Sequence, residues 1–147
     1  MSHSEPIQSA RLQISPGYPL GVTEAMIESL VRAFYVRVQR DQVLGPIFAA
    51  RIGDWEPHLA KMFDFWSSVT LMSGRYHGMP MPAHARIAEI GPEHFQRWLE
   101  LFAETAAEVC PPEAAALFKD RSERIAESLQ MGIAVTRGEL PPLHGRV

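Results

Sequence analysis

The sequence predicts an all-α fold. Four long segments carry apolar residues at intervals of three and four, which is the period of a helix with one buried face. Three of these segments begin at residues that favour helix starts, namely Thr23, Asp54 and Pro92. No segment alternates apolar and polar residues as a half-buried strand does. The pattern therefore indicates a domain built from four main helices.

Length and composition indicate one globular domain. The chain has 147 residues, of which 46% are hydrophobic and 21% charged, and such a chain can bury one core without disulfides or metals. It has no apolar run of about 18 residues and no apolar signal region, so we expect neither a membrane segment nor secretion. The net charge of −3 argues against nucleic-acid binding. The single Cys110 excludes a cysteine-rich metal site and favours a reducing compartment, the cytoplasm.

The first predicted helix covers residues 23–40. Thr23 is suited to cap its N-terminus, because its side chain can accept a backbone hydrogen bond. The expected buried face comprises Ile27, Leu30, Val31, Phe34 and Val38. A short segment, residues 42–52, follows this helix, and we expect Gly45 and Pro46 to break it.

Three further helices complete the prediction. The first covers residues 54–73, with Asp54 as N-cap and Gly74 as the stop. The second begins at Pro92 and ends before Pro111, and the third covers residues 112–135. The expected organisation is a leader without clear periodicity at 1–22, a helical domain at 23–136 and a loose tail at 137–147.

Histidines are the main candidate functional residues, because the common phosphate-binding, nucleotide-binding, nucleophile-elbow and H-E-x-x-H motifs are absent. The chain has six: His3, His58, His77, His84, His94 and His144. His3 and His144 lie in the expected leader and tail, so we expect both to be solvated. We expect the same for His77, in a loop between glycines, and for His94, in the first turn of its helix.

His58 differs because it heads an apolar stripe. Steps of four and three place five residues on one face of the helix that starts at Asp54: His58, Met62, Phe65, Val69 and Met72. A histidine on such a face needs a polar partner or an aqueous pocket. For His58 alone, the slightly favoured interpretation is a half-buried side chain bonded to a carbonyl group.

Other candidates also have simple structural explanations when each is taken singly. His84 follows two prolines and fits an ordinary surface loop, and Lys61 fits a solvated charge. Tyr35 and Trp98 fit core aromatics whose polar atoms find partners. Together they suggest a flat apolar cofactor between the helix of His58 and the segment of His84. A haem iron held by one histidine fits that arrangement.

An ordered set of residues supports this hypothesis. It comprises Phe34-Tyr35, Leu44-Gly45-Pro46-Ile47-Phe48, His58 with Lys61, Phe65-Trp66, then Tyr76, Gly78, Pro80 and His84, and finally Phe95, Trp98, Leu99, Leu101 and Phe102. In this set the chain resembles the truncated haemoglobins, over roughly residues 23–133. The first two groups of that family carry glycine pairs, which this chain lacks. A distal histidine together with a tyrosine and a tryptophan favours the third group.

The resemblance implies a shortened globin fold, in which two antiparallel helix pairs form a two-over-two sandwich around haem b. It implies that His84 is the proximal ligand of the iron and that Phe48 packs against the porphyrin. Met62, Phe65 and Trp66 would line the pocket from the distal helix. Lys61 and Tyr76 would reach the haem propionates, where a charge-assisted hydrogen bond is favourable.

On the distal side, the resemblance implies that Tyr35 and Trp98 donate hydrogen bonds to a ligand on the iron and that His58 guards the entrance. The implied function is the binding of O₂ and other diatomic ligands (CO, NO, cyanide), for storage, oxygen transport or sensing. Strong donors slow the loss of O₂, which favours a sensor, scavenger or catalyst over a shuttle.

Two alternatives remain open. The first is haem-dependent redox chemistry, such as nitric oxide dioxygenation or a peroxidase-like reaction. It needs a separate reductase, because the chain has no flavin or nicotinamide motif. The second is a cofactor-free helical interaction module, which explains the amphipathic helices and treats the histidines as incidental.

Overall fold

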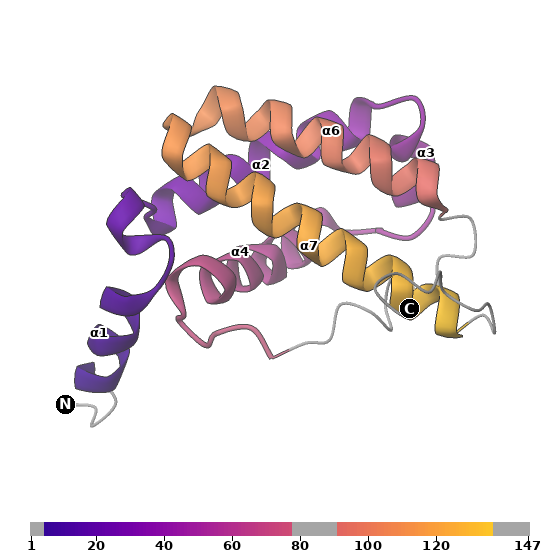
Figure 1. Cartoon of the computed structure of the whole chain (residues 1–147). Coiled ribbons are helices and arrows are strands. Elements are labelled where there is room, and N and C mark those ends of the chain that lie inside the picture. Colours follow the sequence, from indigo (N-terminus) through magenta and orange to yellow (C-terminus); the bar gives the residue numbers. More distant parts are fainter. Residues whose placement is uncertain (1–4, 78–90, 137–147) are drawn as a thin grey trace, which may run out of the picture.

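The computed structural model describes residues 5–77 and 91–136 (Figure 1). All regular elements in these ranges are helical: α1 (Glu5–Ile14), the 3-10 turn η1 (Tyr18–Leu20), α2 (Glu24–Arg40), α3 (Leu44–Ala49), α4 (Trp55–Leu71), α6 (Pro92–Val109) and α7 (Pro112–Thr136). The predicted all-α class is confirmed. Within the same ranges, none of the helices is both long enough and apolar enough to cross a membrane.

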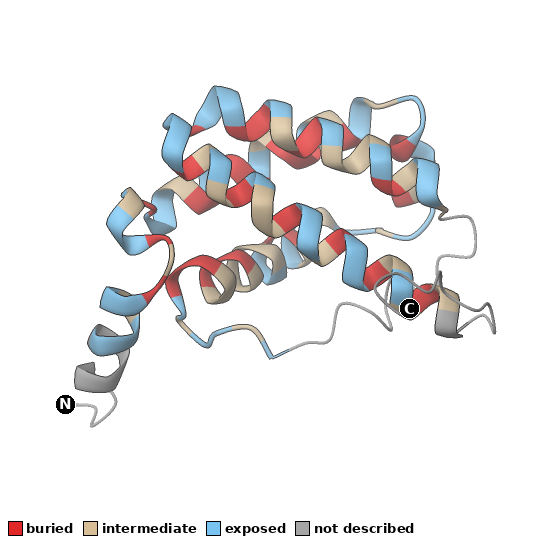
Figure 2. Cartoon of the chain, viewed as in Figure 1, coloured by how far each residue is buried: buried red, intermediate tan, exposed pale blue. Residues whose placement is uncertain are grey.

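The four long helices form two antiparallel pairs. In Figure 1, α4 runs back past α2, and α7 runs back along α6 after a short turn. The helix α2 packs against both α4 and α6, so it joins the two pairs. Figure 2 shows that the buried residues lie on the sides that the helices turn toward one another. Each helix therefore contributes one apolar face to a shared core, as its period predicts.

Aromatic rings form the centre of the core. Phe34, Phe102 and Phe118 are fully buried. The ring of Phe102 lies between two indoles, with ring centroids 5.0 Å from Trp66 and 5.4 Å from Trp98 and nearly parallel planes. Such aromatic contacts each add about 0.5–1.5 kcal/mol beyond the burial of area. The stack therefore fixes the two tryptophans relative to each other.

The predicted helix starts are confirmed. The hydroxyl of Thr23 accepts a hydrogen bond from the backbone N–H of Met26 at 3.2 Å. The carboxylate of Asp54 accepts one from the N–H of Glu56 at 3.3 Å. Each cap satisfies one of the backbone donors that a helix leaves unpaired in its first turn.

The predicted end of α4 is two residues too late. The helix ends at Leu71, and Met72 takes the left-handed conformation with φ of 54°. Gly74, which we expected to be the stop, lies in the turn beyond with φ of 72°. The left-handed cap that sequence reasoning assigned to a glycine is thus formed by a methionine.

The expectation that Gly45 and Pro46 break the chain is wrong, because both lie inside the helix α3. Proline costs no hydrogen bond in the first helical turn, where the N–H has no helical partner. Gly45 allows α3 to sit close to α2, since a Cβ atom there would lie 2.8 Å from the carbonyl oxygen of Gln39.

The leader is more regular than its sequence suggests, since it contains α1 and η1. Its end is docked on the body of the molecule. The N–H of Gly17 donates to the carbonyl oxygen of Thr70 at 2.8 Å, and Ser15 is only 2% exposed. Thr70 lies in the last turn of α4, where carbonyl groups lack helical partners. The leader therefore closes the C-terminal end of that helix. The tail at 137–147 lies outside the described residues.

Candidate functional site

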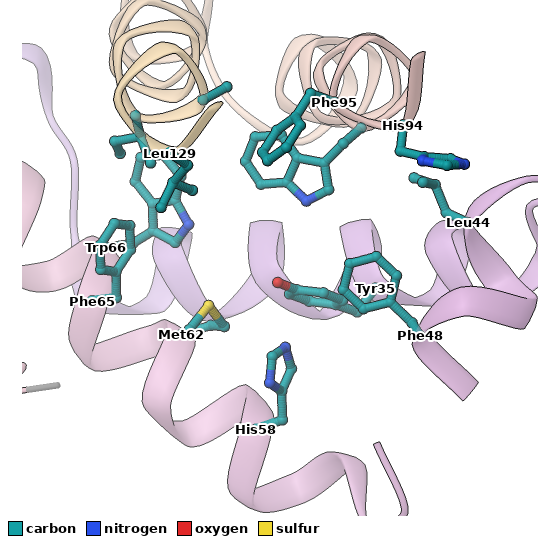
Figure 3. Close-up of a pocket in the computed structure, with 13 residues that line it drawn as sticks. Tyr35, Leu44, Phe48, His58, Met62, Phe65, Trp66, His94, Phe95 and Leu129 are labelled. Atoms are coloured by element: carbon teal, nitrogen blue, oxygen red, sulfur yellow. The ribbon is translucent and has the colours of Figure 1, made fainter. Parts of the chain in front are cut away.

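A pocket lies among five helices, α2, α3, α4, α6 and α7 (Figure 3). It holds about 740 Å³ of empty space, part of it open to solvent. The residues that line it are Tyr35, Leu44, Phe48, His58, Met62, Phe65, Trp66, His94, Phe95, Trp98, Ile125, Ala126 and Leu129. A mostly apolar lining with few polar groups is typical of binding sites for small molecules.

Tyr35 supplies a buried hydroxyl to the pocket. Its residue is 6% exposed, and Figure 3 shows the hydroxyl pointing into the cavity. Burial raises the pKa of Tyr35, so the hydroxyl keeps its proton at neutral pH. Among the described residues, none forms a hydrogen bond with this hydroxyl. It is therefore a donor that is free to act toward the interior of the pocket.

His58 approaches Tyr35 from the opposite wall. The two rings meet edge to face with centroids 5.0 Å apart. Trp55, in the first turn of α4, contacts both rings, at 5.7 Å from Tyr35 and 5.8 Å from His58. The capped start of α4 thus places an imidazole beside the phenol, and half-buried Trp55 packs against both rings.

Trp98 enters the pocket from α6 and is held on two sides. Its indole stacks on Phe102 and meets Phe34 edge to face at 5.3 Å. The same Phe34 ring contacts Tyr35 at 4.9 Å. In the part of the chain that the structure describes, no hydrogen bond engages the indole N–H of Trp98. The Tyr35 hydroxyl and the Trp98 indole N–H are thus two donors whose rings pack on the same buried residue, Phe34.

The structure brings together seven of the ten predicted site residues. They are Tyr35, Phe48, His58, Met62, Phe65, Trp66 and Trp98, and all line the pocket. His84 lies outside the described residues, as do Gly78 and Pro80. Their predicted roles in binding remain predictions.

Lys61 and Tyr76 do not line the pocket. Lys61 is exposed on α4. Tyr76 meets Phe65, a lining residue, edge to face at 5.2 Å, and its backbone N–H donates to the hydroxyl of Ser68 at 2.9 Å. Burial raises the pKa of the Tyr76 phenol. Tyr76 is thus one side chain removed from the cavity.

His94 lines the pocket, although we expected it to be solvated. Its side chain is only 15% exposed, and its Nδ1 atom accepts a hydrogen bond from the N–H of Gly91 at 2.8 Å. This bond caps the N-terminus of α6 and directs the ring toward α3, where Figure 3 shows it beside Leu44. The sequence held one signal for this position, since His94 precedes Trp98 by one helical turn.

The remaining lining residues missed at the sequence level are apolar. Leu44 and Phe95 come from α3 and α6, and the rest come from α7: Ile125, Ala126 and Leu129. Nothing in an apolar stripe distinguishes a residue that faces a cavity from one that faces another helix. Only the packing of α3, α6 and α7 around the pocket does so.

Comparison with known proteins places this geometry in a family. The profile described as bacterial-like globin matches residues 19–131. The chain is 34% identical over 113 residues to the group 3 truncated hemoglobin ctb of Campylobacter jejuni, which covers 74% of this chain and 89% of that protein. The crystal structure of the group III truncated hemoglobin from Campylobacter jejuni matches with a TM-score of 0.71, at 34% identity and with the same coverage.

The sequence comparison and the structural comparison cover equal shares of the chain, and the family profile gives the residues matched. The match spans all four long helices that enclose the pocket, apart from the last residues of α7. The globin fold predicted from the ordered motif is thus confirmed, and the chain belongs to the bacterial-like globin family, as a group III truncated haemoglobin.

Proposed function

We propose that this pocket holds haem b, with His84 as the axial ligand of its iron, and that the protein binds O₂ and related diatomic ligands. Membership of the globin family implies haem binding. The observation that supports the pocket as the site is the buried Tyr35 hydroxyl, which points into an apolar cavity and has no hydrogen bond to another described residue. A buried polar group of this kind normally has a partner, here an added ligand.

The walls of the pocket suit a flat, largely apolar group. Aromatic rings of Phe48, Phe65 and Trp66 face it, and the Met62 thioether can adapt to its surface. When bound, haem would supply an iron atom that takes a diatomic ligand. The apolar side chains would exclude water from that ligand.

Tyr35 and Trp98 would hold the ligand by hydrogen bonds. The buried Tyr35 phenol keeps its proton, and an indole N–H is a donor only. Bound O₂ carries partial negative charge, so each donor would contribute about 1.5–3 kcal/mol if the bond is strongly polar. Two such bonds predict slow release of O₂.

His58 would guard the entrance. Its ring lies beside the Tyr35 phenol, and the half-buried Trp55 packs against both rings, so any movement of His58 would change the surroundings of the donor. Lys61 and Tyr76 would bind the haem propionates from outside the cavity. The exposure of Lys61 and the protonated Tyr76 phenol support this role, because a propionate at the rim requires cationic or O–H donors.

Redox chemistry is the second candidate function. Two donors in one pocket would also polarise an O–O bond, as nitric oxide dioxygenation or a peroxidase-like reaction requires. That function needs a separate reductase as electron donor. The third hypothesis, a cofactor-free interaction module, is disfavoured by the family assignment.

The first test is an absorption spectrum of the purified protein beside the His84→Ala variant, in ferric, ferrous and CO-bound states. We expect a Soret band and a ferrous–CO spectrum in the wild type, and their loss or alteration in the variant. His77→Ala is the matched control, because His77 lies seven residues before His84 in the sequence and is exposed. A wild type that stays colourless after haem is added would overturn the proposal. Turnover of nitric oxide or peroxide with a reducing partner would separate redox catalysis from reversible binding.

A further inference from the structure

Asp41 occupies the junction of three helices. Its side chain is only 5% exposed, although a carboxylate is rarely buried without partners. One carboxylate oxygen accepts hydrogen bonds from the N–H groups of Val43 and Leu44, at 3.1 and 2.9 Å. Its own N–H donates to the carbonyl of Val38, and its carbonyl accepts from Gly45. Asp41 thus ends α2 and caps the start of α3.

Arg97 connects this junction to α6. Its Nε and a terminal guanidinium nitrogen both lie 2.8 Å from the second carboxylate oxygen of Asp41. Charge-assisted bonds of this length are stronger than bonds between neutral groups. One oxygen of the carboxylate therefore binds the start of α3, and the other binds Arg97 on α6.

Both of the joined elements contribute side chains to the pocket wall. Leu44 and Phe48 come from α3, and Trp98 comes from α6, directly after Arg97. A helix of six residues has too few internal hydrogen bonds to hold its own position. The close contact of Gly45 with α2 prevents α3 from moving in that direction. The ion pair supplies a polar restraint toward α6.

We propose that Asp41 and Arg97 are positioning residues of the haem pocket: they hold the α3 wall at a set distance from Trp98 and so determine how firmly haem is retained. The inference rests on the proposed function. It concerns neither the axial ligand nor the residues that face a diatomic ligand.

The test compares Arg97→Met with Arg37→Met in the haem-loaded, full-length protein. Arg37 is a matched control, since it also joins α2 to α6, through Glu108, but makes no bond to the start of α3. Haem transfer to excess apomyoglobin gives the rate of haem loss, and the infrared C–O stretching band of the CO complex gives the order of the pocket. We expect Arg97→Met to lose haem at least about tenfold faster and to broaden or split the C–O band. Arg37→Met should leave both unchanged within about twofold.

A double variant checks that the two residues act as one unit. The rate of haem loss in Asp41→Asn/Arg97→Met should match that of the more severe single variant, not the product of both effects. Should Arg97→Met fail to fold, Arg97→Gln, which removes the charge but keeps a polar side chain, replaces it. Arg97 variants that retain haem and C–O bands like Arg37→Met would overturn the positioning role alone. A wild type without a Soret band would instead overturn the proposed function, and this inference with it.

Discussion

Tyr35 shows how one buried atom carries a functional prediction. Phe34, Phe48, Trp55 and His58 surround its ring, so the side chain has little freedom to turn away from the cavity. Removing the hydroxyl leaves this packing intact and deletes only the donor. The effect of that deletion therefore measures the hydrogen bond itself.

We expect Tyr35→Phe to raise the dissociation rate of O₂ by about 10- to 100-fold, the equivalent of one strongly polar hydrogen bond. Stopped-flow mixing of the oxygenated protein with dithionite or CO measures this rate. Tyr18→Phe is the control, because Tyr18 is half exposed and lies outside the pocket. An unchanged rate in Tyr35→Phe would show that the hydroxyl does not contact the ligand.

At the residue scale, polar residues on apolar helix faces could be predicted from the sequence. A residue that its own helix would leave exposed but that another element covers could not. His58 and Tyr35 could be singled out because each interrupts a stripe that periodicity defines. His94 was expected in solvent, because first helical turns are usually exposed. It lies beside α3, and the sequence of residues 42–52 does not predict that this helix forms.

Among the elements, α3 depends most on its surroundings. Burial by itself raises the pKa of Asp41, but the hydrogen bonds from Arg97 and from the N–H groups of Leu44 and Val43 outweigh it and hold the pKa below its ordinary value of 3.8. The ionised carboxylate is thus favoured in the folded protein. Its contribution to stability is complete above the unfolded pKa and is lost as the pH falls through the lower, folded value.

We therefore expect Asp41→Asn to lower the free energy of unfolding by about 1–2 kcal/mol at pH 7. The difference from wild type should shrink as the pH falls below about 4, where the wild-type carboxyl also becomes protonated. Urea unfolding between pH 3 and 7 measures it. A difference that stays constant over this range would contradict an ionised Asp41 as its source.

Close packing of α3 on α2 gives a second prediction for this element. Gly45→Ala would place a Cβ atom 2.8 Å from the backbone oxygen of Gln39, which cannot turn aside as a side chain can. We expect a loss of about 1–3 kcal/mol in the free energy of unfolding. Gly53→Ala is the matched control, since its Cβ would meet no atom within 4 Å and its φ is not positive. Equal stability of the two variants would disprove the close approach.

The long helices could be predicted because their signals are local. Thr23 and Asp54 cap the helices that follow them, and proline opens α6 and α7. The helix α3 could not be predicted, because its stability comes from Asp41, Arg97 and the surface of α2. The local sequence does not reveal these contacts. The left-handed Met72 is a similar case, since the ion pairs of Arg75 with Glu24 and Asp64 hold the chain just beyond it.

For the molecule as a whole, the pocket and the core share the same helices. The pairing of α2 with α4 and of α6 with α7 was implied by the family resemblance and could not be derived from periodicity, which says nothing about which faces meet. All four of these helices, together with α3, contribute lining residues. A bound group therefore contacts every layer of the fold.

Removal of haem should accordingly lower the stability of the whole domain. At a free haem concentration about a thousandfold above its dissociation constant, binding stabilises the folded state by about 4 kcal/mol. We expect the haem-free protein to unfold in a single transition at a lower urea concentration. Adding haem back should return the midpoint to its original value. Denaturation followed by circular dichroism measures this. Identical midpoints with and without haem would show that the cavity is not the binding site.

The positions of the tryptophans also mean that their fluorescence should report whether the pocket is filled. All three tryptophans of the chain lie at or beside the pocket: Trp66 and Trp98 line it, and Trp55 contacts Tyr35 and His58. A porphyrin close to them would accept their excitation energy, so tryptophan fluorescence should be almost absent in the haem-loaded protein. Loss of the pigment would then appear as a rise in emission, and the filling of the pocket could be followed without any added dye.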